Sequence, residues 1–332
     1  MIALLITGVG GPLGQAIVKA SRASAIPCRI LGTDRTALST ALDWVDRAHI
    51  TPDAADKESY LREIRRLCEE EKIVLILPGS DSELMLLAEH AARLQTETGA
   101  AVVASSAELL GIALDKWRTG LFLQANHLQS PRAALAADKG AVERLIDEVG
   151  FPLIAKPRRG SGSRGLFRVR AIADVNYIRS LGEEMVFQEY LQPDDQEYTV
   201  GVYTQRDGRQ AGAIAFRREL VAGNTYRAWV DQKPVVLREA EAVARALGAR
   251  GPCNVQLRLT AGGPVTFEIN ARFSGTTAMR AHFGFNEVEM AIRDFGLAET
   301  VPPPVVRPGI ALRHWEETYL DAAAQPGNSP PG

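Results

Sequence analysis

The sequence predicts an α/β fold for its N-terminal part and an α+β fold with antiparallel sheets for the rest of the chain. From residue 1 to about residue 104, strand-like apolar runs alternate with amphipathic helical segments. This alternation is typical of a parallel sheet with helices on both faces. Beyond residue 151, strand-like runs follow one another through short turns, which indicates antiparallel pairing.

The N-terminal strands are predicted at the runs IALLI, CRILG, KIVLIL and AAVVA. Helices are expected over SYLREIRRLCEEE and SELMLLAEHAARL. The SDSE stretch at residues 80–83 resembles a cluster of ligand-binding side chains. Ser80 or Asp81 as the N-cap of the following helix is the simpler explanation, and we favour it.

The turn TGVGGPLGQ, residues 7–15, follows the first predicted strand. Gly8, Gly11 and Gly14 lie three residues apart, and Asp34 follows 20 residues after Gly14. This spacing is that of a dinucleotide site, in which the glycines admit a pyrophosphate to a helix N-terminus and the acid binds a ribose. A helix that packs closely on its strand also requires small residues here. The motif alone leaves both interpretations open.

Composition excludes several classes of protein. A chain of 332 residues suggests two or three domains, and a net charge of -2 gives no electrostatic reason to bind nucleic acid. No apolar stretch approaches the ~18 residues of a membrane span. The three cysteines are widely separated without a CxxC pair, which argues against disulfides or a zinc cluster. We expect a soluble cytoplasmic protein with reduced thiols.

The second half of the chain opens with a mainly helical stretch, residues 105–150. The strand FPLIAKP, the loop RRGSGSRG and the strand LFRVR follow, and FQEYL, EYTVGVY and AGAIAFR come after a further helix. The last residues, AAAQPGNSPPG, are small and rich in glycine and proline, so we expect a disordered tail over residues 321–332.

The segment AKPRRGSGSRG combines glycines with cations. Gly160, Gly162 and Gly165 form a loop whose amides can turn toward an anion. Four cationic side chains are expected to converge on it: Lys156, Arg158, Arg159 and Arg164. Such a loop suits a triphosphate, and a solvated basic turn is the alternative. The chain has no GxxxxGK[ST] motif, so ATP would bind by another fold.

The segment CNVQLRLTAGGPVTFEIN, residues 253–270, reads as a hairpin centred near Gly262. In that register Asn254 faces Asn270 and Gln256 faces Glu268, on one face with Arg258 and Thr266. The other face is apolar and consists of Val255, Leu257, Leu259, Val265, Phe267 and Ile269. Mg²⁺ takes oxygen ligands, which Gln256, Glu268 and Asn270 offer. An exposed polar sheet face is the alternative.

These motifs together resemble the ATP-grasp superfamily. They occur in the order DK (residues 115–116), FPLIAKP with its glycine loop, QEYL with Glu197, NVQ and FEINARFS. Within that superfamily the chain is most similar to the carbamoyl phosphate synthetase large subunit and to stand-alone carboxylate-amine ligases, over residues 1–296. The resemblance implies a Rossmann-like domain at 1–110, an ATP-grasp lid at 111–186 and a larger subdomain with a metal site at 187–320.

The resemblance also implies a role for individual residues. Lys116 and Lys156 would hold phosphates under the loop formed by Gly160, Ser161, Gly162, Ser163 and Gly165. Glu189, Tyr190 and Leu191 would meet the adenine, and Glu197 the ribose. Gln256, Glu268 and Asn270 would ligate Mg²⁺, and Arg272 would act with Lys156 in catalysis. Gly10, Gly11 and Arg280 would line the acceptor side.

The implied activity is an ATP- and Mg²⁺-dependent ligase. It would activate a carboxylate as an acylphosphate for attack by an amine or similar nucleophile and release ADP. We expect small-molecule substrates, no nucleic acid or membrane partner, and consider a homodimer. The alternatives are an NAD(P)-dependent oxidoreductase and a non-catalytic nucleotide-binding module. The oxidoreductase is disfavoured because no tyrosine has a lysine four residues later, the pair used by short-chain reductases.

Overall fold

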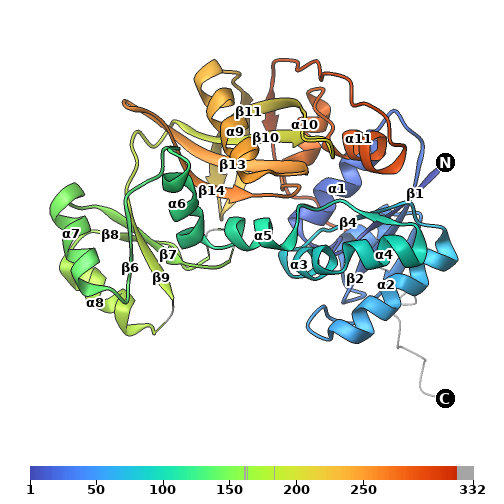
Figure 1. Ribbon diagram of the computed structural model, residues 1–332, viewed down its shortest axis with the longest axis horizontal. Coiled ribbons are helices and arrows are strands. Elements are labelled where there is room, and N and C mark those ends of the chain that lie inside the picture. Colours follow the sequence, from blue (N-terminus) through green and yellow to red (C-terminus); the bar gives the residue numbers. More distant parts are fainter. Residues whose placement is uncertain (161, 163, 183, 320–332) are drawn as a thin grey trace. The chain divides into compact units, whose positions relative to one another are not determined.

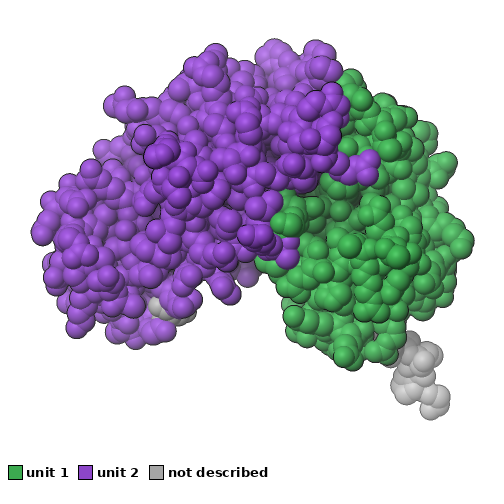
Figure 2. All heavy atoms as spheres, in the orientation of Figure 1, with its two compact units in different colours: residues 1–106, 273–302, 313–332 green, residues 107–272, 303–312 purple. Residues whose placement is uncertain are grey.

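The structure is a computed structural model that describes residues 1–160, 162, 164–182 and 184–319. Two compact units make up the chain (Figures 1 and 2). Unit 1 contains residues 1–106 and 273–302 with the segment that starts at residue 313, and unit 2 contains residues 107–272 and 303–312. The predicted tail at 321–332 lies outside the described residues. The predicted domain boundaries at 110, 186 and 320 stay predictions.

Unit 1 is built on a five-stranded sheet whose strands are all parallel, which confirms the predicted class. The strand order is β3-β2-β1-β4-β5. The strands are β1 (Ile2–Ile6), β2 (Cys28–Asp34), β3 (Arg47–Ile50), β4 (Leu75–Leu77) and β5 (Ala101–Val102). The order reverses between β1 and β4, and in such sheets ligands bind at the carboxyl ends of the strands that flank this point.

The helices of unit 1 come from both ends of the chain. They are α1 (Pro12–Arg22), η1 (Thr40–Trp44), α2 (Lys57–Glu71), α3 (Asp81–Glu89), α4 (Ala91–Thr98), α10 (Thr277–His282), α11 (Glu287–Ala291) and η2 (Ile292–Gly296). Helices α10 and α11 pack on α1. The single helix predicted over residues 82–94 divides at His90. The Ser80 hydroxyl accepts from the Glu83 amide at 3.3 Å, so the predicted N-cap is confirmed.

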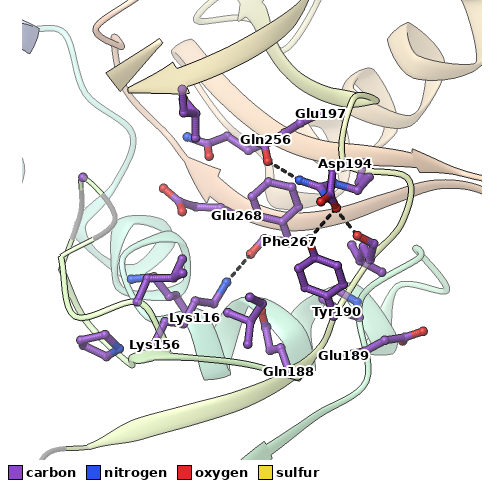
Figure 3. A pocket seen from close by; sticks show the side chains of 18 of the residues that line it. Lys116, Lys156, Gln188, Glu189, Tyr190, Asp194, Glu197, Gln256, Phe267 and Glu268 are labelled. Atoms are coloured by element: carbon purple, nitrogen blue, oxygen red, sulfur yellow. Dashed lines mark hydrogen bonds and ion pairs between the residues drawn. The ribbon is translucent and has the colours of Figure 1, made fainter. Parts of the chain in front are cut away.

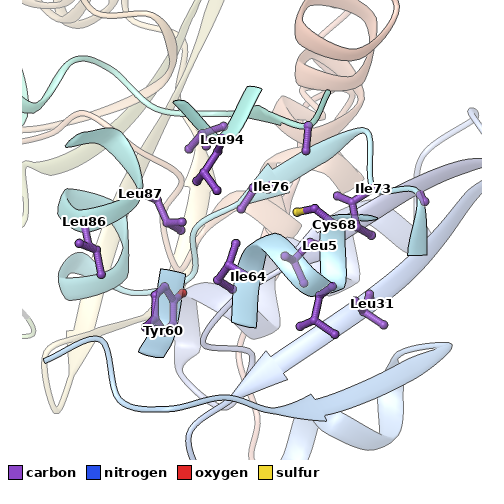
Figure 4. Packing of buried hydrophobic residues seen from close by; sticks show 14 residues of the cluster. Leu5, Leu31, Tyr60, Ile64, Cys68, Ile73, Ile76, Leu86, Leu87 and Leu94 are labelled. Atoms are coloured by element: carbon purple, nitrogen blue, oxygen red, sulfur yellow. The ribbon is translucent and has the colours of Figure 1, made fainter. Parts of the chain in front are cut away.

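Figure 4 shows one apolar core of unit 1, in which Tyr60, Ile64 and Leu67 of α2 pack with side chains of the sheet such as Leu5 and Ile76. Spacings of three and four residues place the three α2 side chains on one face of the helix. The predicted strand KIVLIL starts late because Lys72 adopts a left-handed conformation (φ 53°) that ends α2. Among the described residues, no helix is both long and apolar enough to cross a membrane.

Unit 2 contains two antiparallel sheets. The smaller has the order β6-β9-β7-β8 and the larger the order β14-β13-β10-β11-β12-β15. Strands of the smaller sheet are β6 (Ala133–Leu135), β7 (Leu153–Pro157), β8 (Phe167–Val169) and β9 (Met185–Glu189). Strands of the larger sheet are β10 (Glu197–Thr204), β11 (Gln210–Val221), β12 (Asn224–Val230), β13 (Gly251–Thr260), β14 (Gly263–Asn270) and β15 (Ile310–Leu312).

The helices of unit 2 are α5 (Ala107–Ala113), α6 (Lys116–Ala125), α7 (Lys139–Val149), α8 (Ile172–Ser180) and α9 (Pro234–Leu247). In the smaller sheet, Leu153 and Phe187 share a core with Leu145 of α7 and Ile178 of α8. Helix α9 packs on strands of the larger sheet. The short strand β6 interrupts a stretch that was predicted to be mainly helical.

Candidate functional site

Unit 2 contains a pocket of about 400 Å³ that is lined by residues of both its sheets (Figure 3). Most of the residues predicted to bind the nucleotide or the metal line it: Lys116, Lys156, Gly160, Gly162, Glu189, Tyr190, Leu191, Glu197, Gln256 and Glu268. These residues come from α6, β7, the glycine loop, β9 with the segment after it, β10, β13 and β14. The fold therefore brings together side chains that are up to 152 positions apart in the sequence.

Lys156 is held near the end of β7, with 6% of its surface exposed. Its Nζ donates to the Phe267 carbonyl oxygen at 3.3 Å and lies 5.7 Å from the centre of the Phe267 ring. Burial lowers the pKa of Lys156 to about 8, although the nearby Glu268 carboxylate opposes the shift. A desolvated ammonium in a pocket interacts strongly with an anion because little water screens it.

Lys116 begins helix α6, and its Nζ donates to the Gly160 carbonyl oxygen at 2.6 Å. The preceding Asp115 caps this helix by accepting the amides of Trp117 and Arg118. Both carboxylate oxygens of Asp115 also lie 2.9 Å from Nε of Arg158. Burial raises the pKa of Asp115, but the hydrogen bond from Arg158 and the capped amides outweigh burial, so the pKa lies below its usual value.

Arg158 therefore does not converge on the glycine loop as predicted. Its guanidinium turns to Asp115, which is 1% exposed, because a buried carboxylate requires a partner. Arg159 points in the same direction, with Nε 4.0 Å from an Asp115 oxygen. Of the four cations expected at the loop, Lys156 and Arg164 line the pocket.

The glycine loop has the conformation that glycine permits. Gly160, Gly162 and Gly165 have φ values of 111°, 71° and 67°, all in the left-handed region that side chains disfavour. A β-carbon built at Gly160 or Gly162 would meet nothing within 4 Å, so these two glycines border open space. The predicted phosphate contacts at Ser161 and Ser163 lie outside the described residues.

The other end of the pocket combines apolar and polar groups. Ile154, Leu166 and Leu220 line it beside the segment after β9. The Arg168 guanidinium lies over the Tyr190 ring, 4.4 Å from the centre of that ring. The Tyr190 hydroxyl donates a hydrogen bond to Asp194. We call this part of the pocket the apolar slot, and apolar side chains with a few polar groups are the usual lining of a small-molecule site.

Some backbone groups beside this slot already form hydrogen bonds within the protein. The Glu189 amide donates to the Arg132 carbonyl at 2.8 Å, and the Leu191 carbonyl accepts from Arg258 Nη1 at 2.9 Å. The side chain of Gln188 also lines the pocket and is 4% exposed. The predicted adenine contacts of Glu189, Tyr190 and Leu191 stay predictions.

Glu197 is bound by two arginines. Its Oε1 accepts from Nε and Nη2 of Arg218 at 3.1 and 2.9 Å, and its Oε2 pairs with Arg258. Arg218 is the residue that sequence reasoning missed. Side chains alternate between the two faces of a strand, so the pairing of β10 with β11 could have identified it. Arg217 lies opposite Tyr198, and Arg218 therefore shares the face of Glu197.

The hairpin β13–β14 has the predicted register at its functional end. Asn254 lies opposite Asn270 and Gln256 opposite Glu268. Beyond Gln256 the register shifts, so that Leu257 faces Thr266 and Arg258 faces Val265. One extra residue in β14 therefore forms a β-bulge, which turns side chains away from simple alternation.

The bulge corrects the predicted faces of the hairpin. Thr266 was expected on the polar face, but it is 0% exposed and lies opposite Leu257. Phe267 was expected in the apolar face, but it lines the pocket, where its carbonyl accepts from Lys156. Bulges commonly re-aim side chains next to active sites.

The polar face presents oxygen atoms beside Lys156. Asn270 Nδ2 donates to Glu268 Oε1 at 2.9 Å, which leaves Asn270 Oδ1 and Glu268 Oε2 as acceptors. Within the described part of the chain, no group of three His, Cys, Asp or Glu side chains could hold a metal ion. One carboxylate and one amide oxygen, completed by phosphates and water, are the donor set that Mg²⁺ uses, so Glu268 and Asn270 fit that ion.

Three predicted residues of this region do not line the pocket: Asn270, Arg272 and Gly165. Arg272 follows β14, its amide donates to the Asn270 carbonyl at 2.7 Å, and its side chain is half-buried. Gly165 is crowded, because a β-carbon there would lie 2.8 Å from Pro157 Cγ. The catalytic role of Arg272 and the phosphate contact of Gly165 stay predictions.

The glycine turn of unit 1 is closed by its own contacts. The Gly10 amide donates to Asp34 Oδ2 at 2.9 Å. In a dinucleotide site that carboxylate binds the ribose, whereas here it binds the turn. Gly11 is the N-cap of α1 and is more open, because a β-carbon there would meet only the Gly8 oxygen, at 3.7 Å. The acceptor roles of Gly10 and Gly11 are untested.

Arg280 was expected on the acceptor side, and the structure places it in the interior of unit 1. Its side chain is 0% exposed and forms an ion pair at 3.0 Å with Glu287, which is also 0% exposed. Thr277 donates to the other oxygen of Glu287 at 2.8 Å. This buried ion pair holds α10 to α11. The Arg280 side chain is therefore not accessible to a substrate in this structure.

Comparison with known proteins gives two family matches. Residues 182–318 match the family described as ATP-grasp in the biosynthetic pathway with Ter operon, and residues 4–103 match the PylC-like N-terminal domain. A D-alanine–D-alanine ligase of Nitrosospira multiformis is 37% identical over 78 residues, 24% of each chain. A carbamoyl phosphate synthase large chain of Deinococcus radiodurans is 24% identical over 258 residues, 72% of this chain and 24% of the relative.

The chain therefore spans about a quarter of the length of these two curated relatives. The solved structure of a biotin carboxylase from Campylobacter jejuni is similar with a TM-score of 0.71 and 16% identity. That likeness covers 93% of this chain and 74% of the carboxylase chain, and it concerns the fold. In sequence motifs and in fold, the chain resembles the ATP-grasp ligases.

Proposed function

We propose that the protein is an ADP-forming carboxylate-amine ligase that uses ATP and Mg²⁺. The observation that carries this proposal is the pocket of about 400 Å³ in unit 2. It joins an apolar slot, an acidic group beside it, an oxygen-rich strand face and two lysines under a glycine loop. This order of groups follows the order of base, ribose, metal-bound phosphates and terminal phosphate in ATP.

The nucleoside binds at the slot beside Tyr190 and Leu191, and Glu197 accepts hydrogen bonds from the ribose hydroxyls. The two arginines fix the Glu197 carboxylate in position through two ion pairs. Lys116 and Lys156 contact the phosphates. Glu268 and Asn270 would hold Mg²⁺, which would supply positive charge to the phosphate oxygens.

In the first step, an oxygen of the substrate carboxylate attacks the γ-phosphorus of ATP, and the bond from that phosphorus to the β,γ-bridging oxygen breaks. ADP leaves with the bonding electron pair, and an acylphosphate forms. Phosphoryl transfer depends mainly on positioning and charge neutralisation, which Lys156 supplies on one side and Arg272 on the other.

In the second step, the amine nitrogen attacks the acyl carbon, the bond from carbon to the phosphate oxygen breaks, and inorganic phosphate leaves. The nitrogen loses a proton to solvent or to a base. The glycine loop closes over the phosphates during this sequence, because an acylphosphate hydrolyses when water reaches it.

The carboxylate and the amine are small molecules, and the glycine turn of unit 1 belongs to the acceptor side. A lid at 111–186 and a larger subdomain at 187–320 are the functional divisions we propose for the second part of the chain. A homodimer and a cytoplasmic location complete the proposal.

Isotope transfer tests the chemistry directly. Each member of a panel of amino acids and other small carboxylic acids is labelled with ¹⁸O in the carboxylate and incubated with ATP, Mg²⁺ and an amine panel. We expect ADP release that depends on the acid, with one ¹⁸O atom in the phosphate product. ADP release at the same rate without any acid, or unlabelled phosphate from a turned-over acid, would contradict the acylphosphate.

A further inference from the structure

The side chain of Gln256 has a defined orientation because an arginine faces it. Arg218 Nη2 donates to Gln256 Oε1 at 2.8 Å, and the same guanidinium binds Glu197 Oε1 through Nε and Nη2. The Arg218 side chain is 8% exposed, so this contact is largely shielded from water. One rigid guanidinium therefore connects the acid of β10 to the amide of β13.

This contact decides which end of the amide faces the pocket. A guanidinium carries only donors, so the Gln256 atom beside it must be the carbonyl oxygen and not the NH₂ group. Gln256 lines the pocket, and its Nε2 has no hydrogen-bond partner among the described residues. The two N–H donors of Gln256 are therefore available to an acceptor in the pocket.

A metal ligand would need the opposite orientation. Oε1 is the only atom of Gln256 that can ligate Mg²⁺, and here it is the atom that Arg218 occupies. A dication on that oxygen would lie within a few ångströms of the guanidinium, and the repulsion would be weakly screened at a buried position. Among the described residues, no arginine or lysine donates a hydrogen bond to Glu268 Oε2 or Asn270 Oδ1.

We infer that Gln256 is a donor to a phosphate oxygen of the nucleotide and not a ligand of the metal, with Arg218 as the residue that sets its orientation. This inference rests on the proposed function, since it requires ATP in the pocket. It revises the predicted metal set of Gln256, Glu268 and Asn270 to Glu268 and Asn270. Gln256 then recognises the phosphate chain in the absence of metal as well as in its presence.

The test separates nucleotide binding from metal binding in the full-length protein. Gln256→Met keeps the side-chain length and removes both the donors and the oxygen. ADP is titrated by calorimetry in the presence of a chelator, and Mn²⁺ is then titrated at saturating ADP. Glu268→Gln serves as the positive control for lost metal affinity.

Gln210→Met is the matched negative control. The Gln210 amide has the same pattern of contacts outside the pocket, because its Oε1 accepts from Arg245 at 2.8 Å and its Nε2 donates to the Glu241 carbonyl at 2.7 Å. This variant should bind ADP and Mn²⁺ as the wild type does.

For Gln256→Met we expect metal-free ADP to bind at least about tenfold more weakly, since a hydrogen bond to a charged group is lost. The Mn²⁺ affinity of the ADP complex should stay within about threefold of the wild type. The reverse pattern, or any larger loss of Mn²⁺ affinity, overturns the inference. No ADP binding by the wild type under any condition overturns the proposed function itself.

Gln256→Glu tests the same inference if the methionine variant does not fold or if metal-free ADP binding is too weak to measure. A carboxylate would improve a metal ligand but repel a phosphate oxygen. We therefore expect Mg²⁺-ADP to bind at least about tenfold more weakly. Equal or tighter binding of Mg²⁺-ADP would show that position 256 contacts the metal.

Discussion

The two glycine-rich segments of the protein use glycine for opposite physical reasons. In the turn of unit 1, a β-carbon at Gly14 would lie 2.3 Å from the Gly8 oxygen and 2.6 Å from Val9 Cα. In the loop of unit 2, a β-carbon at Gly160 or Gly162 would meet nothing within 4 Å. Gly14 is required because the backbone around it is close-packed, whereas Gly160 and Gly162 are required because their backbone has positive φ beside open space.

This difference shows why the glycine spacing of the first segment is a poor guide to its ligand. Gly8, Gly11 and Gly14 match a dinucleotide motif, yet the contacts of Gly14 are with the turn itself, and Asp34 accepts from the Gly10 amide. The loop of unit 2 matches no phosphate motif, yet it borders a pocket with two lysines. Open space beside cations, and not the number of glycines, is therefore the feature on which we base the proposed phosphate site.

The largest effect should come from Gly14→Ala. The added methyl group meets backbone atoms that cannot rotate away, so the free energy of unfolding should fall by about 3 kcal/mol, the upper end for overpacking. Denaturant unfolding measures this change, and Gly11→Ala is the control with space for its methyl group. Similar stabilities for the two alanine variants would show that the turn is not close-packed.

Lys156→Met tests the other segment through activity. The loss of a charge-assisted phosphate contact worth about 1.5 to 3 kcal/mol should reduce kcat/KM for ATP by about 10- to 150-fold. The melting temperature should change little, because methionine fills the same space without a buried charge. An early melting transition with unchanged ATP kinetics would instead make Lys156 a structural residue.

The pH dependence of ADP affinity gives a third test. Burial lowers the pKa of Lys156 to about 8 in the free protein, so its ammonium is lost as the pH rises through that value. ADP affinity measured by calorimetry should therefore decrease above about pH 8, by up to about tenfold for each pH unit. Lys156→Met should lack this decrease, and an identical decrease in both proteins would assign it to another group.

Gly162→Ala should have a smaller effect than Gly14→Ala. The methyl group meets no atom, and only the left-handed conformation at φ 71° opposes it. That conformation costs about 1 kcal/mol for alanine, which denaturant unfolding should detect as a small loss of stability. A loss as large as that of Gly14→Ala would mean that this loop is packed against the protein.

Much of the fold followed from patterns along the sequence. The parallel sheet of unit 1 is predicted by alternation of strands and helices, and the pairs Asn254–Asn270 and Gln256–Glu268 follow from period-two alternation around a glycine turn. The bulge at Phe267 could not be predicted, because an extra residue leaves no signal in a run that alternates on both sides of it.

Charged residues were harder to place than apolar ones. A cation in a sequence gives its charge but not its partner, so Arg158 was assigned to the loop although it binds Asp115, and Arg280 to the acceptor side although it is buried with Glu287. Arg218 went unnoticed beside Arg217, since only the pairing of β10 with β11 shows which of the two shares a face with Glu197. Ion pairs over long sequence separations depend on tertiary structure.

The comparison between the two segments is tested most directly by calorimetric titration of the wild type and of Gly11→Val with ATP and with NADPH. A bulky side chain at Gly11 lies in the turn of unit 1, whereas the pocket proposed to bind ATP lies in unit 2. We predict that both proteins bind ATP with dissociation constants within about threefold of each other, below the ~1.4 kcal/mol of a tenfold change, and that neither binds NADPH. Thermal unfolding would first show that the variant is folded. Tight NADPH binding that disappears in Gly11→Val, with no ATP binding by either protein, would contradict the account.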